Sequence, residues 1–338
     1  MSNKLSKDIL RIGNNIRALP VFQIREMNLI LIIVALVIFL SLSNSFFPRW
    51  SNIRIILGSL SIDGIIVIGM TLILISGGID LSVGSMMCLS MTIIATLFLR
   101  GVNPWIAAVV SLIICSGIGA FMGVLVTKLR LSHFIVSLCF MGICRGIVHT
   151  LTTGTPISLV RVLPTVPTFR YVGQGQVGGL IHMSVLIFLV IAIISEFFVR
   201  RSVLLRMVFY TGSNEKAAAY SGINVDRVKI LTSMACSMFA ALTGVIYVSR
   251  FSGVPITAGI GLELTAIASA VIGGVSMNGG KGSVLGAVLG LTLMALVQNA
   301  LTLFYVPAFW QELIRYMIVL TAVSIDALRQ NIIMRRTQ

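Results

Sequence analysis

Long apolar runs separated by short polar segments extend along the whole chain. Most of these runs are near the length of roughly 17–25 residues that an α-helix needs to cross a bilayer. Because a backbone in lipid must satisfy its own hydrogen bonds, such runs favour transmembrane helices. The pattern therefore predicts an all-α, polytopic membrane protein with about ten spans and glycine-interrupted segments. The ten predicted spans are Leu29–Phe46, Leu57–Ser76, Leu81–Leu99, Pro104–Val126, Ser132–Leu151, Ile181–Val199, Ile230–Val248, Leu262–Val275, Val284–Phe304 and Phe309–Leu328.

Polar stretches divide the chain into three predicted parts. We expect a cytoplasmic N-terminal segment at 1–28, a transmembrane domain at 29–328 and a cytoplasmic tail at 329–338. Inside the transmembrane domain, the basic residues 200–229 are expected to form a cytoplasmic loop. The eighth run, Leu262–Val275, is too short to cross a bilayer as a plain helix. We therefore expect a broken or re-entrant element there.

Composition and charge agree with a membrane location. Hydrophobic residues make up 57% of the chain and charged residues 10%, whereas a soluble domain carries about 25% charged residues. The net charge of +15 is spread between the apolar runs and is not gathered on one basic face with aromatics, which argues against a nucleic-acid partner. Lys and Arg concentrate in the segments that share a side with the N-terminus. This bias predicts a multi-pass membrane protein with both termini in the cytoplasm.

The stretch Ser76–Ser85 places Asp80 among several glycines between two apolar runs. A carboxylate or a helix break at membrane depth is tolerated only where it lines a cavity or is buried in protein. Asp80 would cap the helix that follows, and a direct role in a pathway or gate is compatible with that. The stretch Gly273–Gly280 can be aligned with Gly77–Gly84, and paired glycine-interrupted segments in two halves of a chain indicate a transport pathway. Unrelated glycine-rich turns could give the same likeness.

Arg145 lies inside the fifth predicted span and needs a partner or water, and Asp63 and Glu263 are both possible partners. The candidate pathway or gate residues are Gly77, Gly78, Asp80, Ser82, Gly84, Arg145, Glu263, Gly273 and Gly274. No His or Cys stands at metal-ligand spacing, so neither a metal nor a cofactor is expected. The Gly273–Gly282 run departs from the pattern of a nucleotide-binding P-loop, since Gly282 follows Lys281. We expect no catalytic residues and no enzyme activity in this chain.

The polar loop contains a short predicted helix over Glu215–Tyr220, with Gly222 suited to end it. A short helix on the cytoplasmic side can dock in a groove of a soluble partner, although an ordinary solvated loop is the alternative. The candidate partner-contact residues are Asn214, Glu215, Ala217, Ala218 and Gly222.

Four strings resemble one known family over about residues 29–328. They are Gly69–Leu72 with Ser76–Ser85, Arg145-Gly146, Asn214–Val225, and the motifs from Pro255 to Gly282. Together they resemble the inner-membrane permease subunit of bacterial sugar ABC importers of the ribose, xylose and galactoside type. Two positions depart from the family pattern: Lys216 interrupts the alanine pair expected after Glu215, and Thr265 stands where many relatives have Asp.

The resemblance implies an ABC importer permease fold and a pore for a monosaccharide or related polyol. It also implies three partners: an ATP-binding cassette subunit that hydrolyses ATP, a periplasmic or lipid-anchored sugar-binding protein, and a second permease copy. Asn214–Gly222 would be the coupling helix that contacts the ATPase. The alternative is an ion-coupled secondary sugar transporter, which needs intramembrane acids. Only Asp63, Asp80 and Glu263 could serve that purpose.

Overall fold

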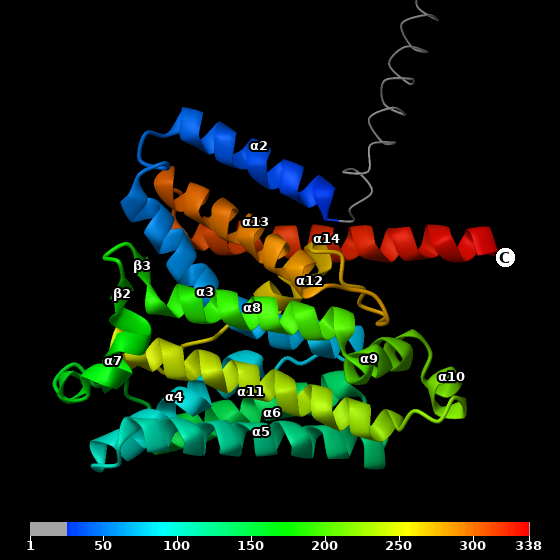
Figure 1. Ribbon diagram of the computed structural model, residues 1–338, viewed down its shortest axis with the longest axis horizontal. Helices are drawn as coiled ribbons and strands as arrows, with labels where there is room; N and C mark the ends of the chain where they lie inside the picture. Colours follow the sequence, from blue (N-terminus) through cyan, green and yellow to red (C-terminus); the bar gives the residue numbers. More distant parts are fainter. Residues whose placement is uncertain (1–25, 338) are drawn as a thin grey trace, which may run out of the picture.

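The computed structural model describes residues 26–337, and most of them are helical (Figure 1). The predicted segment 1–28 therefore lies almost wholly outside the described residues. The helices are α2 (Met27–Ser43), α3 (Trp50–Ile75), α4 (Val83–Leu99), α5 (Pro104–Lys128), α6 (His133–Thr152), α7 (Pro167–Gln174), α8 (Met183–Arg201), α9 (Val203–Ser213), α10 (Glu215–Tyr220), α11 (Val225–Phe251), α12 (Leu262–Ile272), α13 (Val284–Leu303) and α14 (Ala308–Thr337). The all-α prediction is confirmed.

Within the described residues, six helices are long and apolar enough to cross a membrane: α3, α5, α6, α8, α11 and α13. Three shorter apolar helices, α2, α4 and α12, accompany them. Each of the ten predicted spans coincides with a helix, while length and composition support crossing for six of them. The eighth predicted span contains the 11-residue helix α12, and the broken or re-entrant element expected there stays a prediction.

The inner helices are buried and the outer helices expose apolar side chains, as expected for a protein surrounded by lipid. α3 is the most buried of the six long apolar helices, and it lies with α11 between α2, α13 and α14 on one side and α5 and α6 on the other (Figure 1). The outer helices expose large apolar side chains, among them Leu42 on α2, Ile113 on α5 and Ile193 on α8. A soluble protein rarely exposes so many apolar side chains, so lipid is the fitting environment for this surface.

Glycines bring α5 and α11 into close contact. Gly119 and Gly123 are buried on one face of α5. A Cβ atom on Gly119 would lie 2.5 Å from Ser237 Oγ, and one on Gly123 would lie 2.6 Å from the Cα atom of Ile230. Small residues spaced by four let transmembrane helices approach closely. This spacing therefore fixes the distance between α5 and α11.

Two short strand pairs order the segment between α6 and α8. β1 (Ile157–Ser158) pairs antiparallel with β4 (Gly253–Val254), and β2 (Gln176–Val177) pairs with β3 (Ile181–His182). Together with α7 and the turn η2 (Leu163–Thr165), they give this segment a fixed structure. The β1–β4 pair ties the segment to the chain that leads into α12.

Replacing Gly119 by leucine should separate α5 from α11, because overpacking a tight contact costs about 1–3 kcal/mol or more. Gly117 on the same helix is exposed, and a Cβ atom there meets nothing within 4 Å. We predict that Gly119→Leu lowers the melting temperature of the detergent-solubilised protein, while Gly117→Leu leaves it near that of the wild type. Equal melting temperatures for the two variants would contradict this packing.

Candidate functional site

The chain between α11 and α12 is not helical over residues 255–261, and Arg145 of α6 holds this stretch in place. Its Nη1 atom donates hydrogen bonds to the carbonyl oxygens of Ile256, at 2.7 Å, and Ala258, at 3.0 Å. The predicted need of Arg145 for a partner is therefore met by backbone oxygens. Hydrogen bonds from a charged donor to carbonyl groups are among the stronger ones in proteins, so Arg145 fixes the shape of this irregular segment.

Glu263 lies on the other side of the same segment, in the first turn of α12. Its Oε1 atom accepts a hydrogen bond from the backbone N–H of Gly261 at 3.2 Å, and its carboxylate lies within electrostatic range of Arg145. Arg145 and Glu263 thus hold opposite ends of the irregular chain. The structure brings together these two of the predicted site residues.

Gly84 supplies the surface against which the irregular segment lies. A Cβ atom on Gly84 would be 2.0 Å from the carbonyl oxygen of Gly259 and 3.0 Å from Glu263 Oε2. Gly259 itself has φ of 80° and faces the Gly84 backbone. The first turn of α4 and the chain before α12 therefore touch backbone to backbone, and a side chain at either position would push them apart.

Asp80 is fully buried in the turn that precedes α4. Its Oδ1 atom accepts hydrogen bonds from the backbone N–H of Ser82 at 2.8 Å and from Ser82 Oγ at 2.6 Å. The helix begins at Val83, two residues after the predicted start at Leu81. The carboxylate therefore stabilises the turn before the helix, while the N-cap position itself is Ser82 and carries no side-chain cap hydrogen bond. The Oδ2 atom of Asp80 is buried and has no hydrogen-bond partner among the described residues.

The two glycine-rich loops, which lie in the stretches Ser76–Ser85 and Gly273–Gly282, meet at one end of the helix bundle, where α9 joins them. The backbone N–H of Gly280 donates to the carbonyl oxygen of Ile75 at 2.9 Å. A Cβ atom on Gly212 would lie 1.9 Å from the Ile75 oxygen, and one on Gly279 would lie 3.0 Å from the Gly77 Cα atom. We call this contact of Gly77, Gly212, Gly279 and Gly280 the glycine junction. It has no room for any side chain at Gly212.

The two halves of the predicted repeat end their helices in the same way. After α3, the N–H of Gly78 donates to the oxygen of Ile73, and after α12 the N–H of Val275 donates to the oxygen of Ala270. The residues before these donors, Gly77 and Gly274, both have φ of 85°, which is the left-handed conformation that ends many helices. The structural correspondence is therefore Gly77 with Gly274, one residue away from the predicted alignment.

Gly78 and Gly273 each lie next to one of these two left-handed glycines in the chain, but their own contacts differ. A Cβ atom on Gly273 would lie 2.2 Å from the oxygen of Gly286, so the end of α12 packs directly on α13. Gly78 lies beside the ring of His133. That ring contacts the oxygen of Ile79 through Nδ1 at 2.8 Å and Ser233 Oγ through Nε2 at 3.0 Å. His133 therefore attaches the first glycine-rich loop to α11.

The predicted helix in the polar loop is present as α10. The side chain of Asn214 caps it by accepting from the N–H of Ala217 at 3.0 Å, and Gly222 follows with φ of 83°. Ala218 is buried, whereas Ala217 is exposed. Glu215 forms an ion pair with Lys229 of α11 at 2.5 Å. α10 is thus held firmly and presents one face outward.

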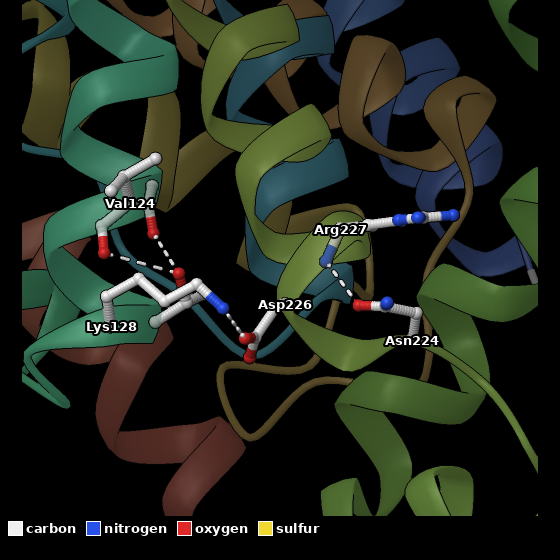
Figure 2. Close-up of polar contacts among 7 residues, drawn as sticks. Val124, Lys128, Asn224, Asp226 and Arg227 are labelled. Atoms are coloured by element: carbon white, nitrogen blue, oxygen red, sulfur yellow. Dashed lines mark hydrogen bonds and ion pairs between the residues drawn. The ribbon is translucent and has the colours of Figure 1, made fainter.

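Figure 2 shows how the start of α11, next to α10, is fixed. The Nζ atom of Lys128, at the end of α5, lies 2.8 Å from Asp226 Oδ2. Asn224 caps α11 by accepting from the backbone N–H of Arg227 at 3.0 Å. The exposed ion pair contributes little free energy by itself, but it connects α5 to the helix that carries Lys229.

Gly212 and His133 are central to these contacts, and neither was predicted as a site residue. The sequence does not indicate the role of Gly212, because its partners Ile75 and Gly280 are distant along the chain. One available signal was the position of His133 at the edge of a predicted span, where a polar ring needs partners.

We predict that Arg145→Met loosens residues 255–261, because it removes two hydrogen bonds from a charged donor, each contributing about 1.5–3 kcal/mol. Amides in this stretch should exchange with deuterium faster than in the wild type. Arg145→Lys should restore part of the protection, and Arg100→Met, at the exposed end of α4, is the control. Unchanged exchange in Arg145→Met would contradict the assigned role.

Comparison with known proteins identifies the family. The model described as "Branched-chain amino acid transport system / permease component" matches residues 52–323. The ribose import permease protein of Escherichia coli (strain K12) is 34% identical over 305 residues, which cover 90% of this chain and 94% of that protein. The same-named protein of Bacillus subtilis (strain 168) is 34% identical over 291 residues, which cover 86% and 89%.

The D-allose transport system permease protein of Escherichia coli (strain K12) is 33% identical over 300 residues, covering 88% of this chain and 89% of that protein. No solved structure matches the chain. The family match covers well over half of the chain, and its apolar helices are those of a multi-pass membrane protein. The chain therefore belongs to this family of permease components, and it is the translocation subunit of an ABC importer, not an enzyme.

Proposed function

We propose that this permease imports a monosaccharide or a related polyol, and that a separate ATP-binding cassette subunit drives it. The observation that carries the mechanism is the glycine junction. It connects α10, through α9, to both glycine-rich loops. The ribose and D-allose permeases among the relatives support the sugar class.

α10 is the proposed docking helix for the ATPase. Its contact residues would be Asn214, Glu215, Ala217, Ala218 and Gly222, with exposed Ala217 as a small side chain that a partner's groove accommodates. Movement of α10 displaces α9, and the backbone contacts at Gly212 pass that displacement to the ends of α3 and α12. ATP binding on the partner would in this way shift the pore between inward-facing and outward-facing states.

The irregular segment 255–261 and the loop around Asp80 form the proposed pathway or gate. Irregular backbone at membrane depth is stable only in protein or along a water-filled cavity, and broken helices commonly form transport sites. Asp80, Ser82 and Gly84 would shape one wall, and Arg145 and Glu263 the other. Gly77, Gly78, Gly273 and Gly274 would act as flexible ends of the helices that move.

The membrane arrangement follows the same proposal. Ten spans are supported by the helix found at each predicted span, and the Lys and Arg bias supports cytoplasmic termini in the bacterial inner membrane. The domain division is then 1–28, 29–328 and 329–338, with the cytoplasmic loop at 200–229. A periplasmic or lipid-anchored sugar-binding protein would deliver substrate to the opposite face, and a second permease copy would complete the pore.

An ion-coupled carrier is the weaker alternative. Asp80 and Glu263 each accept a hydrogen bond from a backbone N–H close in the chain, which is a structural use of a carboxylate. The relatives are permeases of ABC importers, and they provide no support for a proton or sodium site.

Uptake by the complete importer in proteoliposomes tests the energy source. With ATP held constant, an uncoupler should leave sugar uptake unchanged, whereas removal of ATP should abolish it. Asp80→Asn should keep substantial ATP-dependent uptake, because an amide oxygen can still accept from the N–H of Ser82 and Asn caps about as well as Asp. Loss of wild-type accumulation on adding the uncoupler would instead establish ion coupling.

A further inference from the structure

A cavity of about 390 Å³ lies among α3, α12, α13 and α14. It adjoins α12 at Leu262 and Thr265, immediately beside Glu263. Its volume falls in the range of roughly 300–1,000 Å³ that is usual for small-molecule sites. None of the predicted pathway residues lines it. The cavity is therefore a separate feature next to the irregular segment.

Polar side chains from several helices converge on this cavity, although its walls are mainly apolar. Asn52 of α3 and Asn299 of α13 exchange hydrogen bonds between their side-chain amides, at 3.0 and 2.7 Å. The two amides thus hydrogen-bond to each other and form one part of the cavity wall. Polar side chains in transmembrane helices are costly and often mark substrate pathways, so the remaining polar groups of the cavity need an explanation.

Arg315 of α14 and Gln298 of α13 form a fixed hydrogen-bonding surface. The Nη2 atom of Arg315 donates to Gln298 Oε1 at 3.1 Å, and Gln298 donates in turn to Gln311 Oε1. Gln311 is anchored on the carbonyl oxygen of Val306 at 2.7 Å. A guanidinium has five N–H donors. Arg315 therefore keeps donors to offer to a ligand after its contact with Gln298.

Asp63 faces this surface from the middle of α3. It lies within electrostatic range of Arg315, yet the ion pairs found among the described residues, all with N···O distances within 4.0 Å, do not include these two side chains. The carboxylate only accepts hydrogen bonds and the guanidinium only donates them. A ligand that bridges them must offer donors on one side and acceptors on the other.

Hydroxyl groups meet this requirement, because each one both donates and accepts. A polyhydroxylated ligand can donate to Asp63, accept from Arg315, and pair with neutral groups such as Gln298 and Thr265. We propose that this cavity is a subsite for the sugar or polyol, with Asp63 and Arg315 as its paired contacts. The inference deepens the proposed function and depends on it. An amino acid, with its ammonium on Asp63 and its carboxylate on Arg315, is the competing ligand.

Uptake by the complete importer in proteoliposomes tests the subsite. The probes are a panel of aldopentoses and aldohexoses that includes D-ribose and D-allose, with L-leucine as the competing ligand. Asp63→Asn and Arg315→Gln should each lower kcat/KM for the transported sugar about tenfold, the change expected for 1.4 kcal/mol of lost contact. The double variant should lose less than the product of the two, because both side chains hold the same ligand.

Glu312→Gln is the matched control, since it removes a carboxylate from an exposed position on α14 outside the cavity. It should transport like the wild type. Sugar uptake equal to that of the wild type in both Asp63→Asn and Arg315→Gln would overturn the subsite while leaving the proposed function standing. Wild-type uptake of leucine, and of no sugar in the panel, would overturn both.

A thiol-labelling experiment tests the subsite even if Asp63→Asn and Arg315→Gln fail to assemble into the importer. Ser59 lines the cavity and is exposed, so Ser59→Cys should react with N-ethylmaleimide above the background of the native cysteines. The transported sugar should slow this reaction, and leucine should not. No protection by the sugar, or protection by leucine alone, would contradict the proposal.

Discussion

Gly212 places the backbone of α9 against the carbonyl oxygen of Ile75, at a distance that leaves no space for a Cβ atom. The same oxygen accepts a hydrogen bond from the N–H of Gly280, so three segments far apart in the chain meet in one place. Backbone contacts of this kind have no flexible side chain between them to absorb a displacement. The orientation of α10, which follows α9 directly, is therefore tied to both helix ends at the glycine junction.

A transport pathway and the surrounding lipid place opposite demands on the membrane domain, and these demands explain the other contacts of the site. A pathway needs irregular backbone and polar groups, whereas lipid penalises both. The protein satisfies the irregular segment 255–261 from within, through the hydrogen bonds of Arg145 and the close contact of Gly84 with Gly259. The Oδ1 atom of Asp80 is satisfied locally by Ser82, whereas its buried Oδ2 atom has no hydrogen-bond partner among the described residues. Polar groups at depth are thus held by short contacts, and the helices around them can stay apolar.

The sequence was sufficient for features that depend on local chemistry. Each predicted span contains a helix, and α10 occupies the predicted Glu215–Tyr220. Features that depend on contacts between residues far apart in the chain could not be predicted from the sequence. The backbone partners of Arg145 could not be chosen from the sequence, because a carboxylate looked equally suitable. The predicted alignment of the two glycine-rich stretches was wrong by one residue, because only the φ values reveal that Gly77 corresponds to Gly274.

The segment between α6 and α8 and the cavity show the same limit. Strand pairing of β1 with β4 gives that segment order. Asp63 and Arg315 were recognisable as charges in or near spans, but their convergence on one cavity depends on how α3 and α14 pack. Both arise from packing between segments that are remote in the chain.

The ratio of sugar molecules imported to ATP molecules hydrolysed, measured on the assembled importer, tests most directly whether the glycine junction couples the two events. Gly212→Ala adds one methyl group where the Ile75 oxygen would be 1.9 Å away, while Gly142→Ala adds one where nothing lies within 4 Å. Gly212→Ala should still copurify with the ATPase, but its ratio should fall at least severalfold, whereas Gly142→Ala should keep the wild-type ratio. A wild-type ratio in Gly212→Ala would contradict coupling through the glycine junction.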